Sequence, residues 1–480
     1  MKKTNFQPRV SATWMPASKT VIKAGGGIFV GPGQTEDQLQ PVEAERISTT
    51  LSSGALLAIP IDANALRANF INDPNNRSYQ PRAYANEYTL PEKVYSETVS
   101  IQQELPGNMA ATVAYVGSQG RNLFLRSISN RIVGVQTNGA SAGTQVREFD
   151  ILTCADGRVL NGTVSPLTSA SICPGSSIAS IQRPYAEVDY KTSGGHDSYN
   201  AMQLSLTRRS ANGLVLNGQY TLGYSKGITG GSNEAVTAGN NARAIDDFEY
   251  DYGYNNFDVR HTYNFSALYT LPGKGLLTGG WSVGGIFNGR SGLPINVTIG
   301  RNDIVYVDAA GNAFLNPAAD RTAVVNTPGG GASRATRRPD LVPGVDPFIK
   351  DGGLLFLNPA AFTAPKPGTF GNLERNALHG PSFRQVDMVV AKKVPFGRAS
   401  GEFRVEVFNV FNTNNFTNPP STLANALPSN SLTEANKVQP GQAYTPAAAG
   451  SAFGRLNSTV GTTVGLGTNR QVQLAFRLNF

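Results

Sequence analysis

The sequence predicts an all-β fold built from antiparallel strands. Apolar and polar residues alternate with a period of two in segment after segment, and no stretch shows the apolar stripe of an amphipathic helix. Gly, Pro, Asn and Ser, the residues typical of turns, separate these segments. Charged residues make up only 15% of the chain, below the roughly 25% usual in soluble domains, while hydrophobic residues reach 40%. The chain can therefore cover a large apolar surface with few charges.

The predicted strands follow one another along the whole chain and number about eleven. In one of them, Leu214, Leu216 and Tyr220 share one side, whereas Asn217 and Gln219 lie on the other. The last strand keeps its alternation to the final residue, with an apolar side of Val472, Leu474, Phe476, Leu478 and Phe480. The predicted strands span residues 6–14, 20–30, 93–104, 109–118, 199–209, 214–226, 259–271, 280–290, 383–394, 402–412 and 469–480.

The connections between the strands alternate in length. Short turns are predicted at residues 16–19, 105–108, 210–213, 271–275 and 395–400. Long segments lie between them, at residues 31–90, 119–197, 227–257, 291–381 and 414–466. Because successive antiparallel strands reverse direction, short and long connections are expected at opposite ends of the sheet.

Alternation alone does not decide which face of the sheet is wet, and a soluble β-sandwich or barrel is one interpretation. Three features favour a transmembrane β-barrel of the outer-membrane type. The polar face carries large Gln, Asn, Arg and Thr side chains, which a water-filled lumen accepts. Trp14, Tyr224, Tyr269 and Trp281 lie toward the ends of the apolar stripes, as in an interfacial girdle. The alternation of short turns and long loops matches periplasmic turns and extracellular loops, with lipid against the apolar face.

Two other classes of protein are excluded by composition. No stretch approaches the roughly 18 consecutive apolar residues of a transmembrane helix. The net charge of +8 could suggest nucleic acid, but the 41 basic and 33 acidic residues are scattered over the chain. The densest basic pairs, at residues 208–209, 337–338 and 392–393, form no stripe, so nucleic-acid binding is not expected. Residues 1–15 lack the apolar core of a secretory signal.

The chain has two cysteines, Cys154 and Cys173, within a polar stretch rich in Gly, Ser and Thr. A disulfide that closes a loop in an oxidising compartment is the favoured interpretation, and free thiols are the alternative. A metal site is not expected because the segment holds no His and no third Cys. No cofactor is predicted.

The segment AIDDFEYDYGYNNFDVRH is the candidate ligand-binding site, in a predicted extracellular loop. Its carboxylates could hold a hard cation such as calcium, its aromatic rings could stack on sugars, or the loop could pack on itself. It lacks the Gly turn and terminal Glu of an EF-hand loop. The candidate residues are Asp246, Asp247, Phe248, Glu249, Tyr250, Asp251 and Tyr252.

Three further features are interpreted as structural. His261 stands beside Asp258 and Arg260 at the start of a strand without a matching nucleophile, which indicates pairing at a rim and not catalysis. The glycine-rich stretch GGGIFVGPG has no helix after it and therefore lacks the geometry of a phosphate loop. Arg404 and Glu406 lie in the polar row of one strand and could pair with each other.

Several segments together resemble the C-terminal barrel region of Oar-like TonB-dependent receptors of Gram-negative bacteria. They are FQPRVSATW, PGNMAATVAYVGSQGRNLF, DVRHTYNFSALYTLP, RSGLPINV, RPDLVPG, LNPAAFTAPKPGTFGNLERNALHGPSF and VEVFNVFNTNNF, which occur in the family's order. The resemblance implies a receptor with a barrel of roughly twenty-two strands and an N-terminal plug, driven through TonB. The apolar row Leu474, Phe476, Leu478 and Phe480 resembles the C-terminal signal that the barrel-assembly machinery recognises.

The chain departs from this family in ways that shape the functional hypotheses. No segment resembles a plug or a TonB-contacting box, so the sequence is interpreted as the C-terminal half of a receptor, or as a porin-like barrel if one strand is missed. The primary hypothesis is a non-enzymatic receptor that imports an unidentified extracellular ligand. The alternative is a structural or adhesive surface protein. An outer-membrane enzyme is a third class, but no catalytic cluster supports it.

Overall fold

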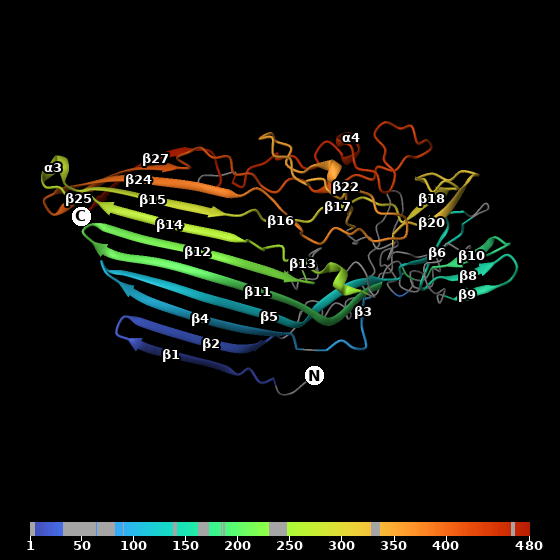
Figure 1. Ribbon diagram of the computed structural model, residues 1–480, viewed down its shortest axis with the longest axis horizontal. Helices are drawn as coiled ribbons and strands as arrows, with labels where there is room; N and C mark the ends of the chain where they lie inside the picture. Colours follow the sequence, from blue (N-terminus) through green and yellow to red (C-terminus); the bar gives the residue numbers. More distant parts are fainter. Residues whose placement is uncertain are drawn as a thin grey trace.

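A computed structural model describes residues 5–31, 64, 82–89, 91–137, 142–161, 172–183, 185, 188–229, 247–327, 337–461 and 466–480. One large antiparallel sheet dominates the described chain, with hydrogen-bonded neighbours in the order β1-β2-β4-β5-β11-β12-β14-β15-β24-β25-β27. Its long strands run side by side, and the small strands lie beyond one end of the sheet (Figure 1). The bounds along this path are β1 Arg9–Ala17, β2 Thr20–Val30, β4 Lys93–Leu105, β5 Met109–Ser129, β11 Val188–Ala211, β12 Leu214–Gly227, β14 His261–Thr270, β15 Trp281–Arg290, β24 Phe383–Phe396, β25 Ala399–Phe408 and β27 Gln471–Asn479.

The register of the sheet places apolar residues of neighbouring strands side by side on one face and polar residues side by side on the other. Cross-strand partners of an antiparallel pair point to the same face. One apolar row crosses the sheet through Trp14, Ile22, Ile101, Val113, Leu204, Tyr220 and Tyr263. On the opposite face, a polar row runs through Gln102, Thr112, Ser205, Gln219, Asn264, Asn288 and Gln385. These rows give the sheet an apolar side from β1 to β14 and a polar side from β4 to β24.

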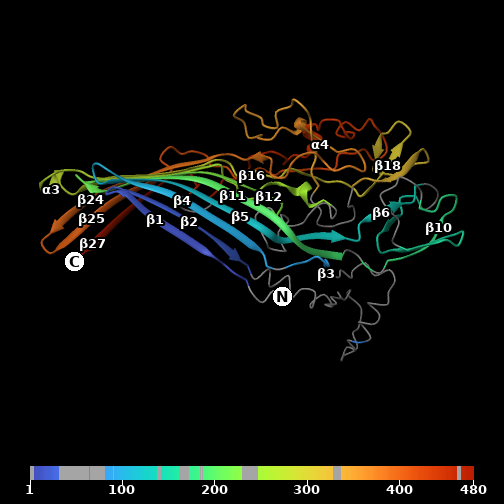
Figure 2. The same ribbon diagram turned by 60° about the horizontal axis from the view of Figure 1, so that its bottom comes forward.

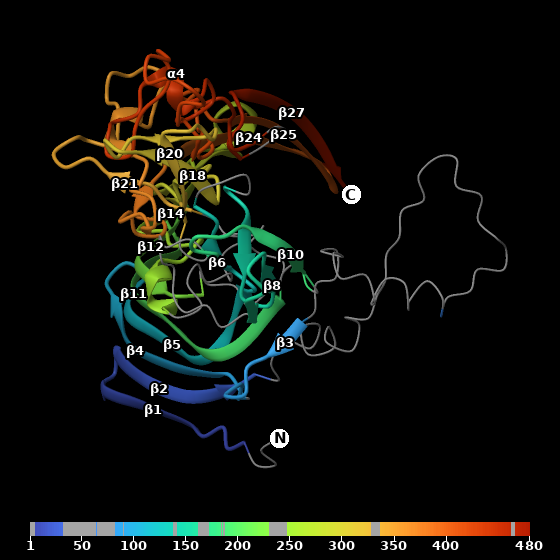
Figure 3. The same cartoon turned by 90° about the vertical axis from the view of Figure 1, so that its right-hand side faces the viewer.

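The sheet curves strongly but does not close in the described residues. Seen along its strands it forms an open arc, with β1 at one end and β27 at the other (Figure 3). Within the described chain, β1 pairs only with β2, and β27 pairs only with β25. The described strands thus form a curved wall like that of the predicted barrel. They do not form a closed ring.

Several strand boundaries differ from the predicted ones. β5 continues to Ser129 and β11 begins at Val188, so both strands extend far into segments predicted as loop. These extensions pair with each other through Val188↔Ser129, and the short β3 (Arg82–Tyr84) adds to β11 in parallel. Side-chain alternation is weak in these extensions, and backbone pairing holds them together. β25 also begins earlier than predicted, because the turn after β24 contains only Gly397 and Arg398.

The short and long connections lie at opposite ends of the sheet (Figures 1 and 2). At the short-turn end, the connection between β14 and β15 contains a single helical turn, α3 (Gly275–Thr278). The described residues also contain the helical elements η2 (Phe248–Asp251), η3 (Pro359–Ala361) and α4 (Pro446–Ala449). Among the described residues, no helix has the length and apolar content needed to cross a membrane.

Two of the long connections fold together into one module, which we call the cap. It consists of residues 291–327, 337–382 and 409–461. The two segments pair directly where β17 (Thr298–Ile299) runs parallel to β26 (Thr422–Leu423). Their core contains Val297, Leu357, Phe362, Leu423, Tyr444 and Phe453. The remaining cap strands are β16 Pro294–Ile295, β18 Ile304–Asp308, β19 Ala313–Phe314, β20 Arg321–Val325, β21 Asp340–Leu341, β22 Phe362–Thr363 and β23 Leu378–His379.

A smaller lobe forms between β5 and β11. It contains β6 Ile132–Val135, β7 Gln145–Arg147, β8 Ile151–Cys154, β9 Val159–Asn161 and β10 Ile178–Gln182. Cys154 and Cys173 form a disulfide in this lobe and pack with Val146, Leu152 and Ile172. A backbone hydrogen bond from Ala323 N to Thr137 O at 3.2 Å connects the lobe to the cap.

Removing the disulfide is expected to destabilise the lobe while leaving the sheet intact. The bond joins residues 19 positions apart, a loop length at which a disulfide contributes about 3 kcal/mol through the unfolded chain. A Cys154→Ser/Cys173→Ser variant should expose the lobe to limited proteolysis between β8 and β10. The core strands should remain protease-resistant, and equal resistance of the lobe in both proteins would contradict the prediction.

Candidate functional site

The predicted ligand-binding segment lies at the long-connection end of the sheet, next to the cap. Phe248–Asp251 form η2, and Gly253–Tyr254 form β13, which pairs with the end of β12. Asp247 is exposed and its side chain forms no cap hydrogen bond with η2. Asp246 lies outside the described residues. We call this segment and the adjoining end of β12 the rim of the sheet.

Asp251, one of the candidate ligand residues, is buried in an ion pair. Its Oδ1 is 2.6 Å from Nη1 of Arg338, and both side chains are almost fully buried. Arg338 also donates to the Tyr250 carbonyl at 2.6 Å and to the Leu373 carbonyl at 2.8 Å. This ion pair fixes η2 against the cap, because a buried charge without its partner is strongly destabilising.

The Tyr250 side chain also points toward the cap. Its ring packs against Phe370 with centroids 4.6 Å apart, and its hydroxyl donates to the Gly371 carbonyl at 2.9 Å. The Arg338 guanidinium lies 4.0 Å from the ring centroid of Tyr250. For Tyr250 and Asp251, the arrangement matches self-packing of the loop, one of the three interpretations of the sequence.

Glu249 and Tyr252 lie on the outside of the same segment, and Phe248 is half-buried. Glu249 Oε1 is 2.8 Å from His196 Nε2, which links η2 to β11. The Tyr252 ring lies 6.0 Å from the His196 ring. The described residues contain no group of three His, Cys, Asp or Glu side chains that could hold a metal ion.

A cluster of cations and aromatic rings adjoins this outer side. The Arg260 guanidinium stacks on the Tyr224 ring at 3.4 Å from its centroid, and Lys226 lies 4.2 Å from that of Tyr254. Such contacts hold the cations in place while leaving the exposed Tyr224 ring accessible. Asp258 is buried beside them, 3.6 Å from Arg260.

His261 makes structural contacts with aromatic residues of the sheet. Its Nδ1 lies 2.8 Å from the Tyr220 hydroxyl, and its ring stacks on Tyr263. The histidine nearest to Asp258 is His379, at 3.4 Å. Residues Gly25 to Gly27 lie inside β2, and a Cβ on Gly27 would lie 2.8 Å from Cγ of Arg9 on the neighbouring strand β1. Arg404 pairs with Glu402 at 2.7 Å and with Glu406 at 3.3 Å.

Arginines that the sequence did not single out attach the cap to the rim. Arg375 donates to the carbonyls of Gly227 and Ile228, at the end of β12, at 2.5 and 2.9 Å. Asn376 donates to the Tyr254 carbonyl at 2.7 Å. Because one buried guanidinium satisfies several carbonyls of irregular backbone, these residues replace the regular ladder where the strands end. Both residues fall within the segment LNPAAFTAPKPGTFGNLERNALHGPSF, which resembles Oar-like receptors, but nothing in that segment indicated that they attach the cap.

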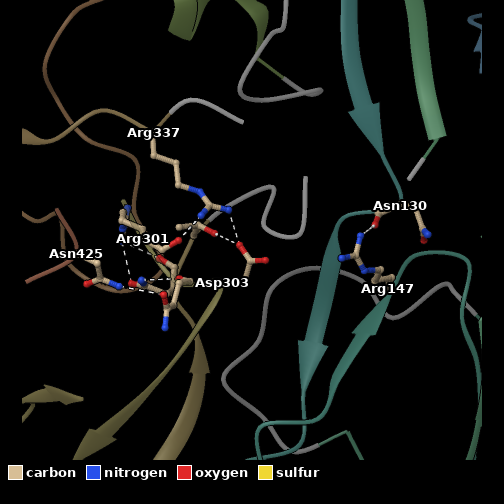
Figure 4. Close-up of polar contacts among 9 residues, drawn as sticks. Asn130, Arg147, Arg301, Asp303, Arg337 and Asn425 are labelled. Atoms are coloured by element: carbon tan, nitrogen blue, oxygen red, sulfur yellow. Dashed lines mark hydrogen bonds and ion pairs between the residues drawn. The ribbon is translucent and has the colours of Figure 1, made fainter. Parts of the chain in front are cut away.

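Inside the cap, Arg301 organises the backbone in the same way (Figure 4). Its guanidinium donates to the carbonyls of Thr369 at 2.9 Å and Asn326 at 2.8 Å. Arg337 donates to the Arg301 carbonyl and pairs with Asp303. Burial, and secondarily the charge of Arg337, lowers the pKa of Arg301 to about 10. Figure 4 also shows Arg147 of the disulfide lobe, which donates to the Asn130 carbonyl at 3.2 Å.

The polar face of the sheet carries a cavity below the rim. It has a volume of about 240 Å³ and lies on β14, β15 and the start of β24. Its polar lining consists of Thr262, Asn264, Asn288 and Arg290, and Val460 and Leu466 border it from the connection before β27. Amide and guanidinium groups around a cavity of this size can hydrogen-bond a small polar group of a ligand.

One family model matches nearly the whole chain. The family model described as "Outer membrane beta barrel domain" matches residues 1–473. No match is found among curated proteins.

Solved structures of transporters align with the chain at low similarity. The FrpB iron transporter from Neisseria meningitidis (F3-3 variant) has 11% identity and a TM-score of 0.37, covering 99% of this chain and 39% of that one. The ferric citrate transporter FecA has 10% identity and a TM-score of 0.34, covering 85% and 34%. FpvA of P. aeruginosa with a bound pyoverdine has 10% identity and a TM-score of 0.36, covering 87% and 30%. The chain thus spans less than two fifths of these proteins. Its assignment rests on the family model: it belongs to the outer membrane beta barrel domain family, which places it in the Gram-negative outer membrane.

Proposed function

We propose that the chain is the C-terminal barrel part of an Oar-like TonB-dependent receptor that imports a ligand across the outer membrane. The observation that carries the proposal is the continuous polar face of the sheet, which runs from Gln102 to Gln385 across the strands. A wall of Gln, Asn, Thr and Ser side chains suits a hydrated or plugged lumen. The motifs shared with Oar-like receptors support the same function.

In this proposal the rim and the cap contact the ligand outside the cell. Asp247, Glu249 and Tyr252 face outward on the rim, and the Asn264, Asn288 and Arg290 cavity lies below them on the lumen side. A ligand captured at the rim would pass these groups on its way inward. Residues 1–480 then form one barrel region with short periplasmic turns and long extracellular loops.

Further strands and a plug complete the receptor in this proposal. In the part of the chain that the structure describes, the outer edges of β1 and β27 have no partner strand. Unpaired N–H and C=O groups there would each cost several kcal/mol in hydrocarbon, so in this proposal both edges pair with further strands. Leu474, Phe476 and Leu478 lie on the apolar side of β27 and, with Phe480, form the proposed signal for the barrel-assembly machinery. A plug that contacts TonB would supply the energy coupling.

The size and the partners of the native protein test this function. Intact source cells are cross-linked with a cleavable reagent, and the protein is then isolated from them with an antibody against residues 469–480. Its size is measured after the cross-links are cleaved. We expect a band well above 50.9 kDa that retains TonB, whereas a porin isolated in parallel retains none. A band of 50.9 kDa without TonB would contradict energised import by this protein.

A structural or adhesive surface protein is the second candidate. The observation that favours it is the cap, whose two segments share a packed core around Leu357, Phe362 and Leu423 and do not form separate loops. A rigid outer surface suits stable contacts with another surface. Loss of cell attachment on deletion of the locus, with the 50.9 kDa band and no TonB, would favour this role.

A further inference from the structure

The connection between β14 and β15 exposes two adjacent leucines at the short-turn end of the sheet. Leu276 is 66% exposed and Leu277 is 84% exposed, both within the single turn α3. Neighbouring leucines of this exposure would be costly in water, since each leaves most of an apolar side chain hydrated. Their environment in the protein therefore needs an explanation.

Hydrogen bonds attach α3 to the apolar side of the sheet. Trp281 and Lys392 are direct cross-strand partners and share that side. The Trp281 indole Nε1 donates to the Leu277 carbonyl at 2.8 Å. Lys392 Nζ donates to the same carbonyl at 3.2 Å and also to the Gly279 carbonyl. The turn thus leans toward the apolar face and away from the lumen side.

This position continues the surface that faces lipid. The row that contains Trp281 and Lys392 proceeds to Phe403 and Phe476, both exposed, with ring centroids 4.7 Å apart. Because the protein is an outer-membrane barrel with a polar opposite face, lipid covers this row. Figure 1 shows α3 at the end of the sheet, beside the short turns.

The charges around α3 match a phospholipid headgroup region. Lys392 lies 5.0 Å from the Trp281 ring centroid on an otherwise apolar row, where a lysine directs its ammonium group toward the interface. Lys274 is exposed at the start of α3. Trp and Lys are both typical of membrane interfaces, and lysine attracts anionic phosphates.

We propose that α3 is a membrane anchor in the leaflet at the short-turn end. Leu276 and Leu277 insert among the acyl chains, while Trp281, Lys392 and Lys274 lie at the headgroups. The anchor fixes the depth of the β14–β15 hairpin. This proposal rests on the outer-membrane location of the protein. It does not rest on the proposed import of a ligand.

Spin labelling of a single introduced cysteine tests this anchor. Both native cysteines are in the disulfide, so Leu277→Cys gives the full chain one free thiol. Arg398→Cys, in the exposed turn between β24 and β25, is the matched control at the same end of the sheet. The labelled proteins are placed in bilayers of phosphatidylethanolamine and phosphatidylglycerol, and collisions with oxygen and with a water-soluble nickel chelate are measured.

The label at residue 277 should collide several-fold more with oxygen than with the nickel chelate, and the label at residue 398 should show the reverse preference. A water-like result at residue 277 would overturn the anchor. Shielding from both reagents would overturn it as well, because it would indicate a covering protein.

Trp281 fluorescence provides a second measurement that leaves α3 unlabelled. In a Trp14→Phe background Trp281 is the remaining tryptophan. Lipids brominated near the headgroup should quench its emission, and Leu276→Ser/Leu277→Ser should reduce that quenching. Unchanged quenching in the serine variant would contradict an anchoring role of the two leucines.

Discussion

Replacing Arg338 by methionine is expected to open the contact between η2 and the cap and to cost about 3–5 kcal/mol of local stability. Three interactions are lost at once: the 2.6 Å ion pair with Asp251, the donation to the Tyr250 carbonyl and the donation to the Leu373 carbonyl. The Asp251 carboxylate remains buried without its cation, which is the largest part of the cost. Amide hydrogen exchange of residues 247–254 and 340–373 measures the opening free energy.

Two further variants determine how much of this cost comes from the Asp251 carboxylate that is left buried without a cation. Adding Asp251→Leu to Arg338→Met removes the carboxylate, so the double variant should be more protected than Arg338→Met alone. Lys350→Ala breaks an exposed ion pair with Asp346, and its effect should stay below about 1 kcal/mol. Equal, small effects of Arg338→Met and Lys350→Ala would show that the buried pair does not hold the rim together.

Replacing Leu204 by arginine is expected to cost about 2–4 kcal/mol, because it places a charge against hydrocarbon. Leu204 lies on the apolar row of β11 between Val113 and Tyr220. Its neighbour Ser205 lies on the polar row between Thr112 and Gln219, where arginine meets water and amide groups. The same substitution at adjacent positions thus has opposite surroundings.

Urea unfolding in phospholipid vesicles measures this difference, with the amount of folded protein in outer membranes as a check in cells. Leu204→Arg should shift the transition to lower urea and reduce the folded amount. Ser205→Arg should leave both close to those of the unchanged protein. If Ser205→Arg were the more damaging substitution, the assignment of the two faces would be reversed.

The arrangement of the sheet could be predicted from the sequence because strand alternation is a local property. In a strand with a period of two, such as residues 214–226, the alternation alone shows which residues lie on each face. No information from any other segment is needed. The short turns carry residues that favour reversal, and β12 and β14 accordingly lie close to their predicted positions. The two-sided character of the wall and its place in the outer membrane follow from these local patterns.

The rim could not be predicted in the same way. Asp251 and Arg338 are 87 residues apart, and no periodic pattern relates them. The sequence grouped Asp251 with exposed acidic neighbours, whereas the fold buries it and leaves Glu249 outside. The cap depends on the pairing of β17 with β26, across more than a hundred residues.

The sequence by itself therefore determined the strands, their two faces and the alternation of short and long connections, since each is set by neighbouring residues. Tertiary structure alone decided which acidic and aromatic side chains of the rim are internal, how two long connections form one cap, and that Trp281 and Lys392 hold α3 by hydrogen bonds. Those features depend on contacts between distant segments, which exist only once the sheet has brought the ends of its strands together.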